Sequence, residues 1–170
     1  IPFSISIMLN NSDPNKFKLY DGVGESICNL VKNGYKVIVI TNQSGISRGL
    51  FSLSDLESIH DKMIREISSK GGKIDAIYYC PHLPEDNCKC RKPRNGLIKL
   101  AITEHNIEIQ GSYFIGDRYM DILAGNSCKL TTILVPERHC RDETMDELRK
   151  NLANPDYICD NFKEAIKIIL

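Results

Sequence analysis

The chain has 170 residues, of which 42% are hydrophobic and 26% are charged, and its 22 basic and 22 acidic side chains cancel. A chain of this length can form one domain with a well-packed core. Zero net charge argues against a binder of nucleic acids or anionic membranes, and no apolar run approaches the roughly 20 residues of a membrane helix.

Helical and strand-like patterns alternate in the first half of the chain. Asp21 is expected to cap a helix whose apolar residues repeat at helical spacing. Residues 36–40 (KVIVI) are β-branched and nearly all apolar, which predicts a buried strand. The next helix is expected to begin at Ser52 or Ser54 and to end at the glycine pair 71–72.

The alternation continues to the end of the chain. Strands are expected at 74–79, 112–115, 131–135 and near Tyr157, and helices at 95–105, 119–128, 142–152 and 161–170. In the helix over 95–105, the side chains of Leu97, Leu100 and Ala101 are expected to face inward. This order predicts an α/β fold, a mostly parallel sheet covered by helices on both faces. Ligands of such sheets bind beyond the carboxyl ends of the strands, which places Thr41, Cys80 and Asp117 at one edge.

A cysteine-rich segment, CPHLPEDNCKCRKP, follows the strand over 74–79. It supplies three thiolates and an imidazole, a set suited to tetrahedral zinc, from Cys80, His82, Cys88 and Cys90. Because protein groups fill all four positions, the zinc is expected to be structural, and residues 80–92 form a zinc loop. Disulfides and a loop that holds cysteines by chance are the alternatives. The odd count of seven cysteines and the lack of a signal-peptide pattern favour a reducing, cytoplasmic environment.

Two further segments carry polar side chains at predicted strand ends. In TNQSGISRG, residues 41–49, hydroxyl, amide and glycine groups can surround an oxyanion, although a polar turn before a helix has the same composition. In FIGDRYMDI, residues 114–122, Asp117 suits a magnesium ion, and Asp121 lies one helical turn further on. A helix N-cap and a surface acid are the ordinary interpretations of these two aspartates.

Taken together, the three segments resemble the haloacid-dehalogenase-like (HAD) phosphatases. The similarity runs from about Tyr20 to Val135 through YDGV, GYKVIVITNQSGISRG, YYCPH, CKCRKP and GDRYMDILAG, in the order of that family. CPH…CxCRKP is similar to the zinc loop of the branch that contains heptose bisphosphate and histidinol phosphatases. The resemblance implies a single domain over residues 1–170, a three-layer Rossmann-like fold, and no large cap domain.

The resemblance also implies roles for the segment after the first predicted strand. Thr41 would bind the phosphoryl group that is transferred, and Asn42, Gln43 and Ser44 would contact phosphate or sugar. Arg48 would reach a second anionic group of the substrate.

The later segments would supply charge and metal. Arg91 and Lys92 would neutralise the phosphoryl oxygens while the zinc holds their loop. Asp117 would bind catalytic magnesium, Arg118 would face the substrate, and Asp121 would support both Asp117 and Lys92. These roles agree with phosphoryl transfer, which depends mainly on positioning and charge neutralisation.

The first motif of the family, Asp-x-Asp-Gly, is not found before Thr41. That motif provides the nucleophile that forms an aspartyl phosphate and a second aspartate that acts as acid and base. One explanation is truncation, with the nucleophile at or before Ile1 and an atypical segment over residues 1–19. The other is that SISIMLNNSD is a degraded first strand in which Asn10 and Ser12 replace the two aspartates. Either explanation predicts that the chain as printed cannot turn over by the family mechanism.

Three functions follow as expectations. The first is a magnesium-dependent phosphatase of a small sugar phosphate, D-glycero-D-manno-heptose 1,7-bisphosphate, because TNQSGISRG resembles the heptose branch. The second is a histidinol-phosphate phosphatase, since the spacer LPEDN resembles that branch. The third is a non-catalytic, zinc-stabilised protein that binds phosphorylated ligands or a partner. A monomer that uses a small phosphorylated substrate, and neither nucleic acid nor membrane, is expected.

Overall fold

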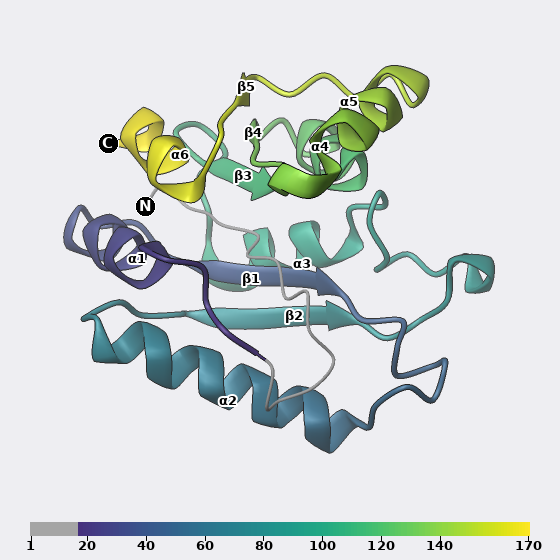
Figure 1. Ribbon diagram of the computed structural model, residues 1–170, viewed down its shortest axis with the longest axis horizontal. Helices are drawn as coiled ribbons and strands as arrows, with labels where there is room; N and C mark the ends of the chain where they lie inside the picture. The colour runs from purple at the N-terminus through teal and green to yellow at the C-terminus, as the bar shows by residue number, and fades with distance from the viewer. Residues whose placement is uncertain (1–16) are drawn as a thin grey trace.

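The computed structural model describes residues 17–170, so Asn10, Ser12 and the rest of the proposed first-motif region lie outside the described residues. Each helix and strand predicted after residue 20 is present (Figure 1). In chain order the elements are α1 (Val23–Lys32), β1 (Ile38–Asn42), α2 (Leu53–Ser69), β2 (Ala76–Cys80), the 3₁₀ turn η1 (Pro84–Asp86), α3 (Gly96–His105), β3 (Tyr113–Gly116), α4 (Tyr119–Ser127), β4 (Thr131–Leu134), the 3₁₀ turn η2 (Arg138–Cys140), α5 (Arg141–Lys150), β5 (Tyr157–Ile158) and α6 (Phe162–Ile169).

The prediction for β1 was two residues too early. The strand begins at Ile38 because the N–H of Val37 donates to the carboxylate of Asp75 at 2.9 Å. It continues to Asn42, which pairs with Cys80 at the end of β2. Thr41 therefore lies within the strand rather than after it.

Two further expectations about helices were wrong. Asp21 does not cap α1, because Gly22 occupies the N-cap position at a φ of 81° and no side-chain cap is formed. In α3, Leu100 is 43% exposed, and Ile98 is buried together with Ala101. The start of α2 is Ser52 rather than Ser54, since Ser52 and Asp55 form a reciprocal capping box.

The strands of residues 17–170 are all parallel, but they form two sheets instead of one, ordered β1-β2 and β3-β4-β5. Helix α2 connects β1 to β2, α4 connects β3 to β4, and α5 connects β4 to β5. In Figure 1 the arrows of β1 and β2 lie side by side and point towards the loop that contains η1. This edge carries the carboxyl ends of both strands.

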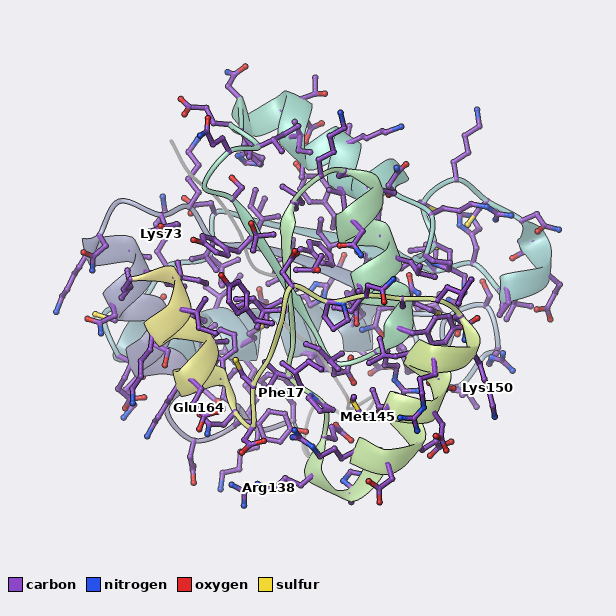
Figure 2. The ribbon with its side chains drawn as sticks, turned by 90° about the horizontal axis from the view of Figure 1, so that it is seen from above. Phe17, Lys73, Arg138, Met145, Lys150 and Glu164 are labelled. Carbon is purple, nitrogen blue, oxygen red and sulfur yellow. The ribbon has the colours of Figure 1, made fainter. Side chains whose placement is uncertain are left out.

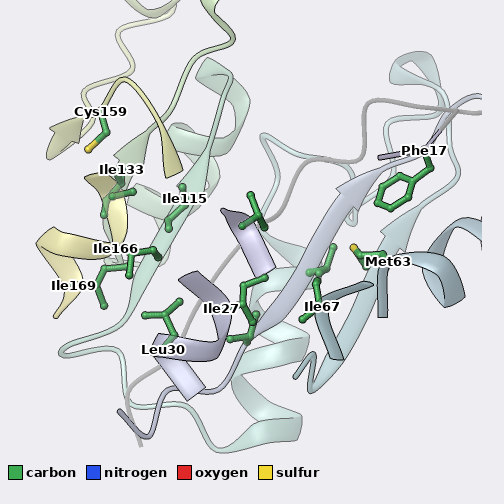
Figure 3. Close-up of a cluster of buried hydrophobic side chains, with 14 of the residues drawn as sticks. Phe17, Ile27, Leu30, Met63, Ile67, Ile115, Ile133, Cys159, Ile166 and Ile169 are labelled. Atoms are coloured by element: carbon green, nitrogen blue, oxygen red, sulfur yellow. The ribbon is translucent and has the colours of Figure 1, made fainter. Parts of the chain in front are cut away.

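Two hydrophobic clusters show that the sheets belong to one layer. Alternate residues of β1 enter different clusters, with Val39 packed among α1, α2 and α6 and Ile40 packed against α3. Strand β3 behaves in the same way, since Ile115 joins the first cluster and Phe114 joins the second. Figure 3 shows the first cluster, where side chains of α1, α2 and α6 meet those of β3 and β4. The result is a three-layer α/β fold, and no cap domain is seen within the described residues.

Candidate active site

A buried lysine–aspartate pair connects the end of the zinc loop to α4. Lys92 Nζ lies 2.6 Å from Asp121 Oδ1, and the two side chains are only 9% and 5% exposed. The second carboxylate oxygen of Asp121 accepts hydrogen bonds from the backbone N–H groups of Asp117 at 3.2 Å and Arg118 at 3.1 Å. Asp121 thus ties the ammonium group to the turn that carries Asp117.

Strand β1 holds Lys92 at both its main chain and its tip. The side-chain oxygen of Asn42 accepts from the Lys92 N–H at 3.0 Å, and its amide nitrogen donates to the Lys92 carbonyl at 3.1 Å. The ammonium group donates to the Ile40 carbonyl at 2.8 Å and lies 5.9 Å from the centre of the Phe114 ring. A cation fixed in this way is already in place when charge develops nearby, which is the condition for electrostatic catalysis.

Gly116, which was not among the predicted site residues, ends β3 and adjoins the turn that carries Asp117. A Cβ atom on Gly116 would lie 2.1 Å from Asp121 Cβ, so only glycine allows α4 to approach the strand end. Asp117, which comes next, is 6% exposed. Burial raises its pKa to about 8, and the negative charge of Asp121 contributes, while Arg118 and Lys92 act in the opposite direction. A divalent cation at this carboxylate would favour its ionised form.

Thr41 and Gln43 are buried at the end of β1. Gln43 Nε2 donates to the Thr41 hydroxyl oxygen at 3.0 Å, and the Gln43 N–H donates to the Cys80 carbonyl at 2.7 Å. Because the Thr41 oxygen accepts from Gln43, the hydroxyl proton is directed elsewhere and can be donated to an anion. In the following turn Ser44 is half-buried and Arg48 is exposed.

The four expected zinc ligands converge on one point. Their ligand atoms all lie within 4.8 Å of one another. Cys80 Sγ is 3.5 Å from Cys88 Sγ and 3.2 Å from Cys90 Sγ, and His82 Nδ1 is 3.2 Å from Cys90 Sγ. Tetrahedral zinc with Zn–S bonds of about 2.3 Å needs sulfur atoms about 3.8 Å apart, so a small outward movement fits the ion. The sulfurs are too far apart for disulfides, which require about 2.05 Å, and all seven cysteines are free.

The thiol pKa values in this cluster move in both directions. Burial raises the pKa of Cys80 to about 12. Burial also opposes ionisation of Cys88, yet hydrogen bonds from Cys90 and from backbone N–H groups lower the pKa of Cys88 to about 7. A bound divalent metal would draw all three thiols to the thiolate form.

Hydrogen bonds from arginine side chains to backbone carbonyls fix the shape of the zinc loop. Arg91 donates to the His82 carbonyl at 3.2 Å, and Arg94 donates to the Cys88 carbonyl at 2.8 Å. A Cβ on Gly96 would lie 2.4 Å from the Lys89 carbonyl oxygen, so glycine is needed where α3 meets the loop. Arg94 and Gly96 had no predicted role. Both follow shortly after the RKP segment, but their contacts depend on how the loop folds back.

A cavity of about 430 Å³ opens beside Asp117. Its wall also includes Tyr20, Glu137, His139 and Asn161, which come from the segments before α1, after β4 and before α6. Apart from Asp117, these residues were not predicted to line a site. They are distant in sequence and carry no motif, so only the fold brings them together.

The structure brings together most of the predicted site residues but not all of them. Asn42, Lys92, Asp117 and Asp121 form one connected network with the end of β1. Arg91 is directed to the zinc loop. Arg48 and Arg118 are both exposed, and Arg118 Nε lies 3.6 Å from Asp117 Oδ2. The Asn42 amide is engaged by the Lys92 backbone, which makes it a positioning residue in this structure.

Comparison with known proteins identifies the family of the chain. A family model described as HAD-hydrolase-like matches residues 89–165. The D-glycero-beta-D-manno-heptose-1,7-bisphosphate 7-phosphatase of Helicobacter pylori is 36% identical over 164 residues, which cover 93% of this chain and 87% of that protein. The chain belongs to the D,D-heptose 1,7-bisphosphate phosphatase family of HAD-like hydrolases.

Other members of the family extend the comparison. The D-glycero-alpha-D-manno-heptose-1,7-bisphosphate 7-phosphatase of Campylobacter jejuni is 34% identical, covering 87% of this chain and 83% of that protein. The crystal structure of D,D-heptose 1,7-bisphosphate phosphatase from B. bronchiseptica, complexed with magnesium and phosphate, superposes with a TM-score of 0.85 at 26% identity. That alignment covers 99% of this chain and 96% of the crystallised one. Within residues 17–170, no helix has the length and apolar character needed to cross a membrane.

Proposed function

We propose that this HAD-like hydrolase is a magnesium-dependent phosphatase that removes the 7-phosphate from D-glycero-D-manno-heptose 1,7-bisphosphate. The observation that carries the proposal is the Lys92–Asp121–Asp117 network at the strand ends of a chain 36% identical to a heptose bisphosphate 7-phosphatase. The relatives include enzymes for both anomers of the sugar, so either anomer is a candidate substrate.

Each residue at the strand ends has a separate role in the proposed phosphoryl transfer. The Thr41 hydroxyl donates to a phosphoryl oxygen, since its own oxygen already accepts from Gln43. Lys92 supplies positive charge from a fixed position. Asp117 offers a buried carboxylate to magnesium, which would keep several waters and neutralise charge on the phosphoryl group when bound. The nucleophile of the family, an aspartate that becomes phosphorylated, belongs to a motif that the printed sequence does not contain before Thr41.

Zinc has a structural role in this proposal. Cys80, His82, Cys88 and Cys90 use all four positions of a tetrahedral ion, which leaves none for water or substrate. The ion would hold the loop from which Arg91 and Lys92 extend. Arg48 and Arg118, which are exposed, would reach the non-reacting end of a bisphosphate.

The test compares two forms of the protein. One is the chain as printed, and the other carries an Asp-x-Asp strand placed before it. Phosphate release is measured with magnesium from both anomers of the heptose bisphosphate and from histidinol phosphate. Release from the heptose substrates by the second form, with loss of activity in Asp117→Asn, is the expected result. If that form is folded and hydrolyses none of these phosphates, the proposed function is wrong.

A second candidate is binding of phosphorylated ligands without turnover. It would use the same residues, since Thr41, Lys92 and Asp117 are polar groups buried at the strand ends. Magnesium-dependent binding of phosphate or vanadate to the chain as printed, without hydrolysis by either form, would favour it.

A further inference from the structure

A second group of metal-ligating side chains lies away from the zinc loop. Glu137, His139 and Cys140 each offer one ligand atom, and these atoms lie within 4.8 Å of one another. Glu137 is the N-cap of η2, which follows β4, and His139 and Cys140 lie within η2. Figure 2 shows their neighbour Arg138 at the edge of the molecule, where ions from solvent have access.

Hydrogen bonding orients the Glu137 carboxylate towards this point. The Tyr20 hydroxyl donates to Glu137 Oε1 at 2.9 Å, while Glu137 Oε2 lies 3.3 Å from His139 Nε2. One oxygen is therefore fixed from behind and the other faces the imidazole. Partners of this kind, which hold a ligand in place without touching the metal, are typical of metal sites in proteins.

The space and the charge next to the cluster also suit a cation. A small cavity of about 20 Å³ is lined by Glu137, Cys140 and two further acids of α5, Glu143 and Glu147. This volume holds about one water molecule or one ion. Asp117 adds another carboxyl group to the wall, and Arg118 is the one basic residue in it.

We infer that Glu137, His139 and Cys140 bind a divalent transition metal ion of the zinc class. A thiolate and an imidazole select such ions over magnesium or calcium, which prefer oxygen ligands. Three protein ligands leave one position of a tetrahedral ion open to water or an anion. This is the pattern of an exchangeable site rather than of the closed Cys₃His set.

The position of the site brings the ion next to the 430 Å³ cavity beside Asp117. Asp117 and Glu137 line both the small cavity and the 430 Å³ cavity. An ion held by Glu137 would therefore lie close to the carboxylate of Asp117, which is proposed to hold magnesium. Its positive charge would disfavour a second cation at Asp117, so excess zinc should compete with magnesium. The site itself does not depend on the proposed phosphatase activity.

The test counts zinc at equilibrium. The reduced chain of 170 residues is freed of metal and dialysed against zinc that is buffered by a competing chelator, and bound zinc per chain is measured. The wild-type chain should bind two ions of different affinity. His139→Ala and, separately, Cys140→Ser should weaken only the weaker site, by at least about tenfold. Arg138→Ala, an exposed neighbour in the same turn, is the matched control and should retain both sites.

Cobalt gives a second readout that does not depend on affinity. The second equivalent of Co²⁺, which fills the weaker site, should add a thiolate-to-cobalt charge-transfer band to the spectrum of the wild-type chain. Cys140→Ser should lack this additional band. One zinc per wild-type chain would overturn the inference and leave Glu137 and His139 as a surface ion pair. Two sites that remain unchanged in both ligand variants would overturn it as well.

Discussion

Replacing Asp121 by asparagine should destabilise the protein strongly, although the two side chains have the same shape. In the native structure one carboxylate oxygen pairs with Lys92 Nζ and the other accepts from the N–H groups of Asp117 and Arg118. An asparagine has one oxygen and one NH₂ group. If the oxygen faces the backbone, the NH₂ group faces the ammonium, and if it is turned round, the NH₂ group faces two N–H donors. In either orientation buried donors face each other.

The magnitude follows from burial. Breaking a buried ion pair by removing one partner costs about 3–5 kcal/mol, because the remaining charge stays away from water. Lys92 keeps its bond to the Ile40 carbonyl, so we expect the lower end, about 3 kcal/mol in the free energy of unfolding. For a chain of this size that lowers the melting temperature by roughly 6–12 °C. Removing the charge of Asp121 should also lower the pKa of Asp117 from about 8, since that charge helps to raise it.

Asp142→Asn is the matched control. Asp142 is an exposed acid in the first turn of α5, as Asp121 is an acid in the first turn of α4, so both changes remove the same interaction with a helix N-terminus. That interaction is worth only about 0.3–1 kcal/mol. The free energy of unfolding of both variants is measured in urea at a constant zinc concentration. Equal losses of stability, within about 0.5 kcal/mol, would refute the idea that the buried network matters.

Three further predictions concern other parts of the structure. Cys88→Ser should remove tight zinc binding and weaken magnesium-dependent phosphate binding by about tenfold, as measured by calorimetry. A phosphate affinity that is unchanged after zinc is lost would contradict the structural role of the ion. Gly116→Ala should displace Asp121, whose Cβ would lie 2.1 Å from the new methyl group, and lower the melting temperature. Gly34→Ala meets no atom within 4 Å but lies at a φ of 84°, so its loss of stability reports backbone strain alone, and the loss for Gly116→Ala should exceed it. Burial holds the pKa of His60 below its ordinary value of 6.5. The stability that neutral His60 contributes is therefore present above pH 6.5 and is lost as the pH falls. His60→Gln should reduce the loss of stability that the protein shows between pH 7.5 and pH 5.5.

The order of helices and strands could be predicted because apolar periodicity is a local property of the sequence. The end of α3 at His105 and the start of α4 at Tyr119 could also be predicted, but other ends could not, because long-range partners decide them. Strand β1 begins after Val37 since Asp75 takes the Val37 N–H, and these two residues are far apart in sequence. Helix α3 turns Ile98 rather than Leu100 inward because of the side chains that it meets on β1.

The candidate site was predictable where motifs carry it. The ligand spacing of CPH…CxC and the aspartate after β3 both follow from residues close in sequence. The cavity wall was not predictable, because Tyr20, Glu137 and Asn161 meet only after the chain has folded. The role of Asn42 was also hidden, since its partners are backbone atoms of a residue fifty positions away.

The contacts around Lys92 change how the zinc loop should be understood. If zinc alone fixed Lys92, loss of the ion would release the ammonium group. Yet the Lys92 main chain is bound by Asn42, and its tip is bound by Asp121 and the Ile40 carbonyl, none of which belongs to the zinc loop. Arg91, in contrast, donates to the carbonyl of the zinc ligand His82. Zinc should therefore position mainly Arg91, while β1 and α4 position Lys92, so the two neighbouring cations depend on different parts of the fold.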